Sequence, residues 1–264
     1  MAASKLIQAN TMDTTIESFS SFEENIAQSE KLLTFRLYGS FAHFNQPISN
    51  RFRNTYSIIP KPQLLGLIGS IVGLSGYKNA AVSPEFYSKL SDLKVFIKCN
   101  SLSEKKFTLS YNSLNSFLNN RIDSGSPNVI IKEQVLLDPD YEVGIVVNEN
   151  NPLHLEIIDK IRMNCGVFPI YFGKNEFFAN VQFGHLKDFE YDNSESNKCC
   201  SIFPFEEVES VNTRNMKLEL LPVDFDDMFK YIYRLMAIPS EKCNVSLKNS
   251  DNYIASEGSV YYVF

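Results

Sequence analysis

The segment PKPQLLGLIGSIVGL, residues 60–74, constrains the fold of this chain more than any other segment. Its apolar residues recur at helical spacing, and its two prolines stand where a helix tolerates them, at or just before its first turn. Three glycines share one face of the predicted helix: Gly66, Gly69 and Gly73. Each glycine costs a helix about 1 kcal/mol relative to alanine. We therefore expect another backbone to approach this face closely.

Strands and a second helix surround this segment. In KLLTFRLYG, the apolar Leu33, Phe35 and Leu37 alternate with other residues, which predicts a strand. The later elements are strands in 91–100 and 168–183, two strands on either side of the turn Asp138–Pro139–Asp140, and a helix in 151–164. A Ser- and Asn-rich excursion fills 101–128. This order predicts an α+β fold compatible with a ferredoxin-like, RNA-recognition-like core.

Composition narrows the class of protein. The chain has 264 residues, 44% of them hydrophobic, which suffices for a sizeable core. Its longest apolar run, Leu64–Leu74, is shorter than the roughly 20 residues that span a bilayer, and its start does not resemble a signal peptide. An odd number of cysteines without a CxxC motif, and three distant histidines, predict no disulfide framework, no metal site and no cofactor. We expect a cytoplasmic protein with no membrane partner.

Charge is distributed unevenly along the chain, although the net charge is −6. Residues 31–110 hold eleven Lys and Arg against three acids, whereas residues 111–264 hold thirteen Lys and Arg against twenty-three acids. A basic region joined to an acidic remainder suits a protein with one surface that faces a polyanion. Chance clustering of charges is the alternative.

The segment before the glycine-spaced helix has the composition of a single-stranded RNA surface. Arg51, Arg53 and Lys61 are cations in a loop that leads to a helix start, where phosphate binds favourably. Three aromatic residues of this region could stack on unpaired bases: Phe41, Phe44 and Tyr56. The alternative is a solvated basic loop over buried aromatic rings.

The sequence supports a catalytic function less well than RNA binding. The helix reads GxxGxxxG instead of a nucleotide-binding GxGxxG, and the chain has no GxSxG or HExxH motif. Metal-free RNA cleavage could use Tyr56, Lys61 and His43. Because His43 lies between Ala42 and Phe44 near a strand end, a packed, hydrogen-bonded imidazole is the favoured reading.

The excursion also has RNA-binding character. It combines cations with aromatic residues: Lys105, Lys106, Arg121, Phe107, Tyr111 and Phe117. A basic hairpin of this kind could lie across a nucleic-acid strand. It could equally be a flexible surface loop.

Four stretches together resemble a known family: FRLYGSFAHFNQP, TYSIIPKPQLLGLIGSIVGL, KEQVLLDPDYEVGIVV and FPIYFGKNEFFANV. They are similar to the CRISPR-associated RAMP subunit that holds the 5′ handle of the guide RNA (crRNA) in Cascade effectors, with the type I-B branch most similar. The similarity runs from about Lys31 to Val181 and more loosely to the C-terminus.

This resemblance implies an RNA-recognition-like RAMP domain, which is a modified ferredoxin-like fold, with an inserted thumb β-hairpin at about 102–128 and a smaller C-terminal β-rich part. It implies that the loop and helix after residue 50 cradle the handle, through Arg51, Arg53, Tyr56, Lys61, Gln63, Leu64 and Gly66. The other candidate RNA-binding residues are His43, Phe44, Lys105, Lys106 and Arg121. The implied partners are the crRNA handle, the Cascade backbone subunit, the large subunit and, indirectly, target DNA.

The expected function is therefore a non-catalytic Cascade subunit in antiviral defence. In the type I-C branch the corresponding subunit cleaves precursor crRNA with Tyr, Lys and His, but this chain lacks that branch's adjacent Lys–His pair. A metal-free endoribonuclease of the same family and an unrelated α+β interaction scaffold are the alternatives. The expected domains are an acidic, flexible extension at 1–30, the RAMP domain at 31–185, and an acidic linker with a C-terminal subdomain at 186–264.

Overall fold

The computed structural model describes residues 30–48, 52–78, 82–100, 105–114, 128–191, 199–211, 216–239, 245–247 and 252–264. The N-terminal extension expected at 1–30 therefore lies outside the described residues, except for Glu30. The fold is mostly β with few helices, in agreement with the broad α+β prediction.

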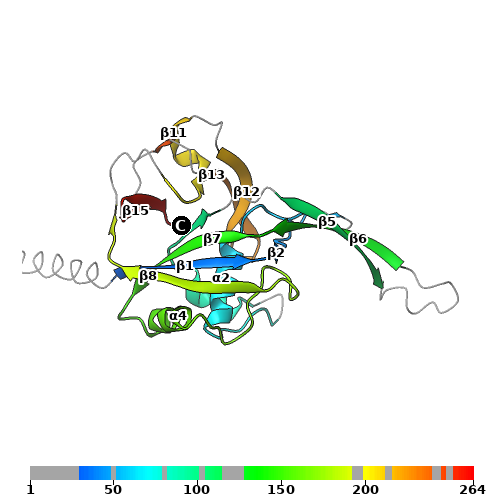
Figure 1. Ribbon diagram of the computed structural model, residues 1–264, viewed down its shortest axis with the longest axis horizontal. Coiled ribbons are helices and arrows are strands. Elements are labelled where there is room, and N and C mark those ends of the chain that lie inside the picture. The colour runs from blue at the N-terminus through cyan, green and yellow to red at the C-terminus, as the bar shows by residue number, and fades with distance from the viewer. Residues whose placement is uncertain are drawn as a thin grey trace, which may run out of the picture.

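A four-stranded antiparallel sheet forms the centre of the molecule (Figure 1). Its strands, in spatial order, are β4 (Val95–Cys99), β7 (Asp140–Asn148), β1 (Glu30–Gly39) and β8 (Ala179–Lys187). The alternation predicted for the first strand is confirmed, because Leu33, Phe35 and Leu37 are buried in the main core. Leu32 is also buried, but it belongs to a separate cluster with Phe96, Tyr261 and other residues. Both faces of the sheet are therefore covered.

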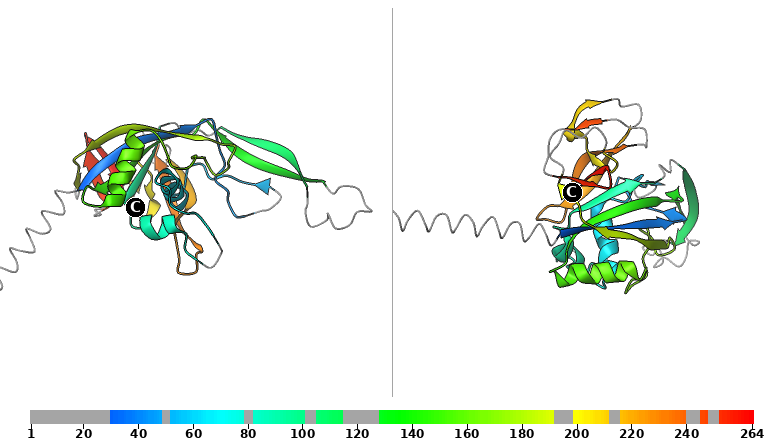
Figure 2. Two further views of the ribbon diagram at one scale, coloured as in Figure 1. Left: turned by 90° about the horizontal axis from the view of Figure 1, so that it is seen from below. Right: turned by 60° about the vertical axis from the view of Figure 1, so that its left-hand side comes forward.

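Two helices pack against one face of this sheet, as the left view of Figure 2 shows. They are α2 (Lys61–Ile71) and α4 (Pro152–Arg162). Both predicted helices are confirmed. Pro60 occupies the N-cap position of α2 and Pro62 lies in its first turn, as expected, and α4 begins at Pro152. The Asn151 side chain caps α4 by accepting a hydrogen bond from the Leu153 backbone N–H.

The close approach predicted at the α2 glycines is made by a side chain and not by another backbone. A short helix, α3 (Glu85–Leu90), carries Phe86 across this face of α2. A Cβ on Gly69 would lie 2.5 Å from the Cβ of Phe86, and one on Gly66 would lie 3.6 Å from the Phe86 ring. The glycines thus make room for α3.

A long β-hairpin extends away from the body of the molecule (Figure 1). It consists of β5 (Lys106–Leu114) and β6 (Asn128–Leu137). β6 also pairs with β2 (Phe41–Ala42) and, in parallel, with β3 (Phe52–Arg53), and it leads into β7 through the predicted turn. The range predicted for the hairpin, 102–128, covers β5 but ends where β6 begins. Residues 115–127 lie outside the described part of the chain.

The C-terminal part is β-rich, as expected. Its elements are β9 (Glu190–Tyr191), β10 (Phe203–Pro204), the 3-10 helix η2 (Phe205–Glu207), β11 (Val208–Val211), β12 (Met216–Phe225), β13 (Tyr231–Pro239), β14 (Val245–Leu247), β15 (Tyr253–Ser256) and β16 (Ser259–Tyr262). Strands β10, β13 and β12 form one sheet, and β16, β15 and β9 form another. The division of the chain at residue 185 stays a prediction. None of the described helices is both long and apolar enough to cross a membrane.

Candidate nucleic-acid interface

The charge asymmetry of the sequence is partly neutralised by folding. Four cations of residues 31–110 pair with acids that lie later in the chain, in the pairs Lys31–Glu149, Arg36–Asp140, Arg53–Glu133 and Lys98–Glu142. These pairs place acidic residues of β6, of β7 and of the turn directly after β7 against basic residues of β1, β3 and β4. Within the described structure, four of the eleven cations in residues 31–110 are therefore paired with acids of residues 111–264.

His43 is packed, as the favoured reading of the sequence had it. Its side chain is buried, and its Nδ1 lies 2.7 Å from the Gln134 backbone oxygen. A carbonyl oxygen can only accept, so Nδ1 donates this hydrogen bond. The geometry gives no support to a direct contact between His43 and RNA.

Phe44 and Tyr56 are buried too. The Phe44 ring meets the Phe172 ring edge-to-face at 5.7 Å, and the backbone N–H of Tyr56 donates to the Phe44 carbonyl. Burial, together with a hydrogen bond to Tyr233, raises the pKa of the Tyr56 hydroxyl. In this conformation neither ring is available to stack on a base. Phe41, by contrast, is exposed at the foot of the hairpin and contacts the Phe107 ring at 5.8 Å.

The start of α2 lies beneath the C-terminal part of the chain. The Lys61 ammonium is 5.9 Å from the centre of the Phe264 ring, and burial lowers the pKa of this lysine. Lys61 also lines a cavity of about 330 Å³ with residues of the C-terminal strands, such as Asp224 and Arg234. Leu64 is buried, and Gly66 is covered by Phe86. Handle binding at this helix start stays a prediction without geometric support.

The foot of the hairpin is organised around Glu133 on β6. Its fully buried carboxylate accepts hydrogen bonds from Lys174 Nζ at 2.8 Å and from the Tyr111 hydroxyl at 3.3 Å. Arg53 Nη1 lies 3.9 Å and His43 Nε2 lies 4.0 Å from the same carboxylate. Burial acts to lower the pKa of Lys174, but its hydrogen bonds to Glu133 and Glu176 outweigh this and raise it.

Sequence reasoning missed Glu133 and Lys174. One signal was present, because side chains alternate along a strand and Glu133 lies between Ile131 and Val135 on the inward face of β6. A charged residue in the middle of an apolar alternation needs buried partners. The sequence did not show which cations would provide them.

Further cations surround residues 55–57. Lys106 Nζ donates to the Thr55 carbonyl at 2.8 Å, and Lys217 Nζ donates to the Ser57 hydroxyl at 2.7 Å. Glu219 accepts from the Ser57 backbone N–H at 2.9 Å, which attaches β12 to this segment. Lys105, directly before β5, and Lys132, on β6, are exposed nearby. Arg51 and Arg121 lie outside the described residues.

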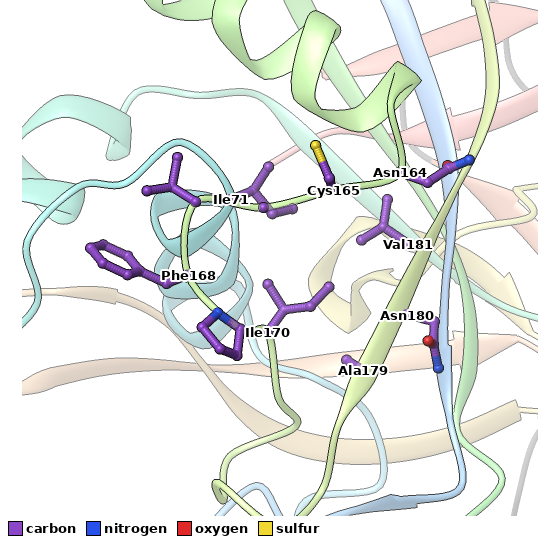
Figure 3. A pocket seen from close by; sticks show the side chains of 11 residues that line it. Ile71, Asn164, Cys165, Phe168, Ile170, Ala179, Asn180 and Val181 are labelled. Carbon is purple, nitrogen blue, oxygen red and sulfur yellow. The ribbon is translucent and has the colours of Figure 1, made fainter.

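These cations, with Phe41 and Tyr111, can contact a phosphate backbone and stacked bases. Within the described part of the chain, no group of three or more His, Cys, Asp or Glu side chains could hold a metal ion. A different hollow of about 400 Å³ lies between the end of α2, the α4–β8 connection and the start of β8. Figure 3 shows Ile71, Phe168 and Ile170 among its lining residues, and none of the predicted site residues belongs to it.

The sequence model of the CRISPR-associated protein family Cas_Cas5 matches residues 32–214, more than two thirds of the chain. The chain belongs to this family. The match begins within β1 and ends beyond β11, so it includes the central sheet, the hairpin and the Glu133 cluster. The family resemblance seen in the sequence is thus confirmed, whereas the type I-B branch stays a prediction.

Several solved structures are similar to this chain of the Cas5 family. A CRISPR protein from Archaeoglobus fulgidus is 14% identical, with 89% of this chain and 97% of that chain covered and a TM-score of 0.47. A chain of a CRISPR RNA-guided surveillance complex is 12% identical, with 83% and 91% covered and a TM-score of 0.46. A chain of the type III-B Cmr-beta complex bound to cognate target RNA and AMPPnP is 15% identical, with 88% and 99% covered and a TM-score of 0.45.

Because all three TM-scores are below 0.5, we base no conclusion about the site on these similarities. No curated protein matches the chain in sequence.

Proposed function

We propose that this chain is a non-catalytic subunit of a type I-B-like Cascade complex that binds and caps the 5′ handle of crRNA. The observation that carries this proposal is the gathering of cations and an exposed aromatic ring at the foot of the β5–β6 hairpin in a chain of the Cas5 family. Single-stranded RNA is bound by such combinations of basic and aromatic side chains.

The order of elements supports a ferredoxin-like RAMP core. Strand, helix, strand, strand, helix, strand follow one another as β1, α2, β4, β7, α4 and β8, and the strands lie in the order β4-β7-β1-β8. The β5–β6 hairpin is inserted between β4 and β7. In this proposal it is the thumb that crosses the guide RNA.

The proposed protein partners are the Cascade backbone subunit and the large subunit. The β12–β13 ribbon offers a surface for one of them, because Leu220 and Leu235 are opposed across the two strands and both are exposed. Leu218 and Tyr233 are also exposed on this ribbon. Exposed apolar groups gathered on one face commonly mark protein–protein contacts.

The proposal excludes a catalytic role, and the side-chain contacts support this. The three residues considered for cleavage have separate partners: His43 contacts Gln134, Tyr56 contacts Tyr233, and Lys61 lies over Phe264. A general base must lie within hydrogen-bond reach of the proton that it takes, and in this conformation His43 and Tyr56 are buried against their own partners. Repeat RNA incubated with the chain without metal should remain uncut, and a specific cut would favour the endoribonuclease alternative.

Handle binding is tested by removing two cations before α2. The double variant Arg51→Ala, Arg53→Ala should bind a handle oligonucleotide about 5- to 30-fold more weakly, which corresponds to a loss of 1–2 kcal/mol. If both side chains contact phosphates, the slope of log affinity against log salt should fall by roughly 1.4, since single strands contribute about 0.7 for each contact. The measurement is fluorescence anisotropy at several salt concentrations.

The control is Lys160→Ala, Arg162→Ala on α4, which removes the same charge far from the hairpin (Figure 1). This pair should change neither the affinity nor the slope. An unchanged slope in the Arg51, Arg53 variant would contradict the proposed site.

A further inference from the structure

The carboxylate of Glu133 joins five segments that are distant in sequence. Besides β6, which carries Glu133, these are the segment directly after β2 through His43, β3 through Arg53, β5 through Tyr111 and the α4–β8 connection through Lys174. Arg53 and Glu133 are also direct partners in the parallel β3–β6 register. The hairpin therefore leaves the body of the molecule at a point where one buried carboxylate contacts side chains from four other segments.

Stability is a poor explanation for this arrangement. Removing a carboxylate from water carries a penalty of several kcal/mol, and apolar residues of similar volume often replace a buried ion pair without loss of stability. The flanking inward residue Val135 is fully buried and shows that apolar side chains fit on this face. A buried charge in such a place is better explained by the geometry that it imposes on its partners.

The side chains of Arg53 and Lys174 contact Glu133 and are at the same time partly exposed to solvent. The Arg53 side chain is 40% exposed and that of Lys174 is 22% exposed, while Glu133 is not exposed at all. Arg53 therefore keeps donors for an incoming phosphate, and its orientation is set from beneath. Lys174 is further fixed above the Tyr111 ring, with its Nζ 5.2 Å from the ring centre.

We infer that Glu133 is a positioning residue for RNA binding: it holds Arg53 and Lys174 at the foot of the hairpin in the orientation that receives the RNA backbone. This inference rests on the proposed function and adds a residue that never contacts the RNA itself. It also links the direction of the hairpin to the position of β3, because Tyr111 and Arg53 contact the same carboxylate oxygen.

The direction in which one substitution changes the affinity for RNA distinguishes positioning from simple electrostatics. Glu133→Gln removes a negative charge next to the proposed path of a polyanion, so Coulomb's law alone predicts tighter RNA binding. Positioning predicts the opposite, because the neutral amide holds Arg53 and Lys174 less firmly than a carboxylate does. We expect Glu133→Gln to weaken handle binding about 5- to 30-fold.

Glu176→Gln is the matched control. Glu176 also pairs with Lys174, at 3.1 Å, but its side chain is largely exposed and touches neither Arg53 nor Tyr111 in the described residues. The same charge is removed within the same cluster, and binding should be unchanged or tighter. A double-mutant cycle completes the test, since Glu133→Gln should weaken binding less in an Arg53→Ala background if Glu133 acts through Arg53.

The outcomes are distinct. If the wild-type chain does not bind the handle, the proposed function fails and the inference fails with it. If the wild type binds and Glu133→Gln binds equally well or more tightly, only the inference is overturned. Should Glu133→Gln not fold, as judged by its thermal unfolding, Glu133→Asp replaces it. That variant keeps the charge but shortens the side chain, so electrostatics predicts no loss of affinity and positioning predicts weaker binding.

Discussion

At the scale of single residues, Gly144 shows how an absent side chain shapes the central sheet. Gly144 on β7 is the register partner of Phe96 on β4, and a Cβ at this position would collide with the Phe96 ring. The space lets the Phe96 ring lie flat against the sheet and stack on Tyr261, with 4.1 Å between the ring centres. A single glycine thus allows β16 to cover this face of the sheet.

Gly144→Ala should therefore destabilise the protein. Overpacking a well-filled interior costs about 1–3 kcal/mol, and the Phe96 ring is held in place by its stacking on Tyr261. Chemical denaturation followed by circular dichroism measures the change. Gly76→Ala is the control, because no atom lies within 4 Å of a Cβ at that position, and it should leave stability the same or slightly higher. Equal stability of both variants would contradict this account of Phe96.

Whether a single side chain is buried or available to RNA could be predicted from the sequence only in part. The packed reading of His43 was correct because a lone histidine between apolar neighbours near a strand end usually finds a backbone partner. Phe44 and Tyr56 could not be distinguished from stacking residues, since their burial depends on Phe172 and Tyr233, which are more than 100 positions away. Local pattern gives the type of side chain but not what covers it.

At the scale of elements, Asp140 connects three strands at the end of the turn that follows β6. Its carboxylate accepts two hydrogen bonds from the Arg36 guanidinium on β1, at 2.7 and 3.0 Å, and one from the Asn100 amide at the end of β4, at 2.9 Å. The bonds from Arg36 lead the causes that hold the pKa of Asp140 below its ordinary value. The pairing therefore stabilises the folded state most when the carboxylate is ionised.

Stability contributed by Asp140 should thus depend on pH. Because its pKa is lower in the folded than in the unfolded state, the contribution is complete above the unfolded pKa of about 4 and disappears as the pH falls through the folded value. Asp140→Asn should be less stable than the wild type at pH 7, and the difference should vanish at lower pH. Asp159→Asn on α4, an exposed residue without an ion pair in the described chain, is the control and should show no such trend. A difference independent of pH would contradict this assignment.

Elements themselves were predictable where the signal was local. The alternation of β1, the prolines that begin α2 and α4, and the Asp138–Pro139–Asp140 turn all follow from neighbouring residues. The predicted hairpin range ends where its second strand begins. In the structure, β6 pairs with β5 along nearly its whole length and with β2 and β3 in the half nearer the body. Pairings over such distances leave no periodic mark in the sequence.

At the scale of the whole molecule, the two halves of the chain share one core. The main buried cluster contains strand residues of the central sheet together with Ile202, Leu221, Met236 and Ile238 from the C-terminal part. Removal of either part would expose apolar side chains of the other. We therefore expect the described parts to unfold together, with a single transition, although the sequence suggested separate domains.

Met236 tests this expectation, because it lies in the C-terminal ribbon but is fully buried in the common core. Met236→Ala should lower the free energy of unfolding by about 2–5 kcal/mol and shift the whole transition. Met228→Ala, at the 70% exposed Met228, should stay within about 0.5 kcal/mol of the wild type. Tyrosine fluorescence and circular dichroism should give coincident curves for all three proteins. Two transitions, with only the earlier one shifted by Met236→Ala, would instead show that the C-terminal part unfolds independently. If both parts share one core, loss of the Met236 side chain must destabilise them together.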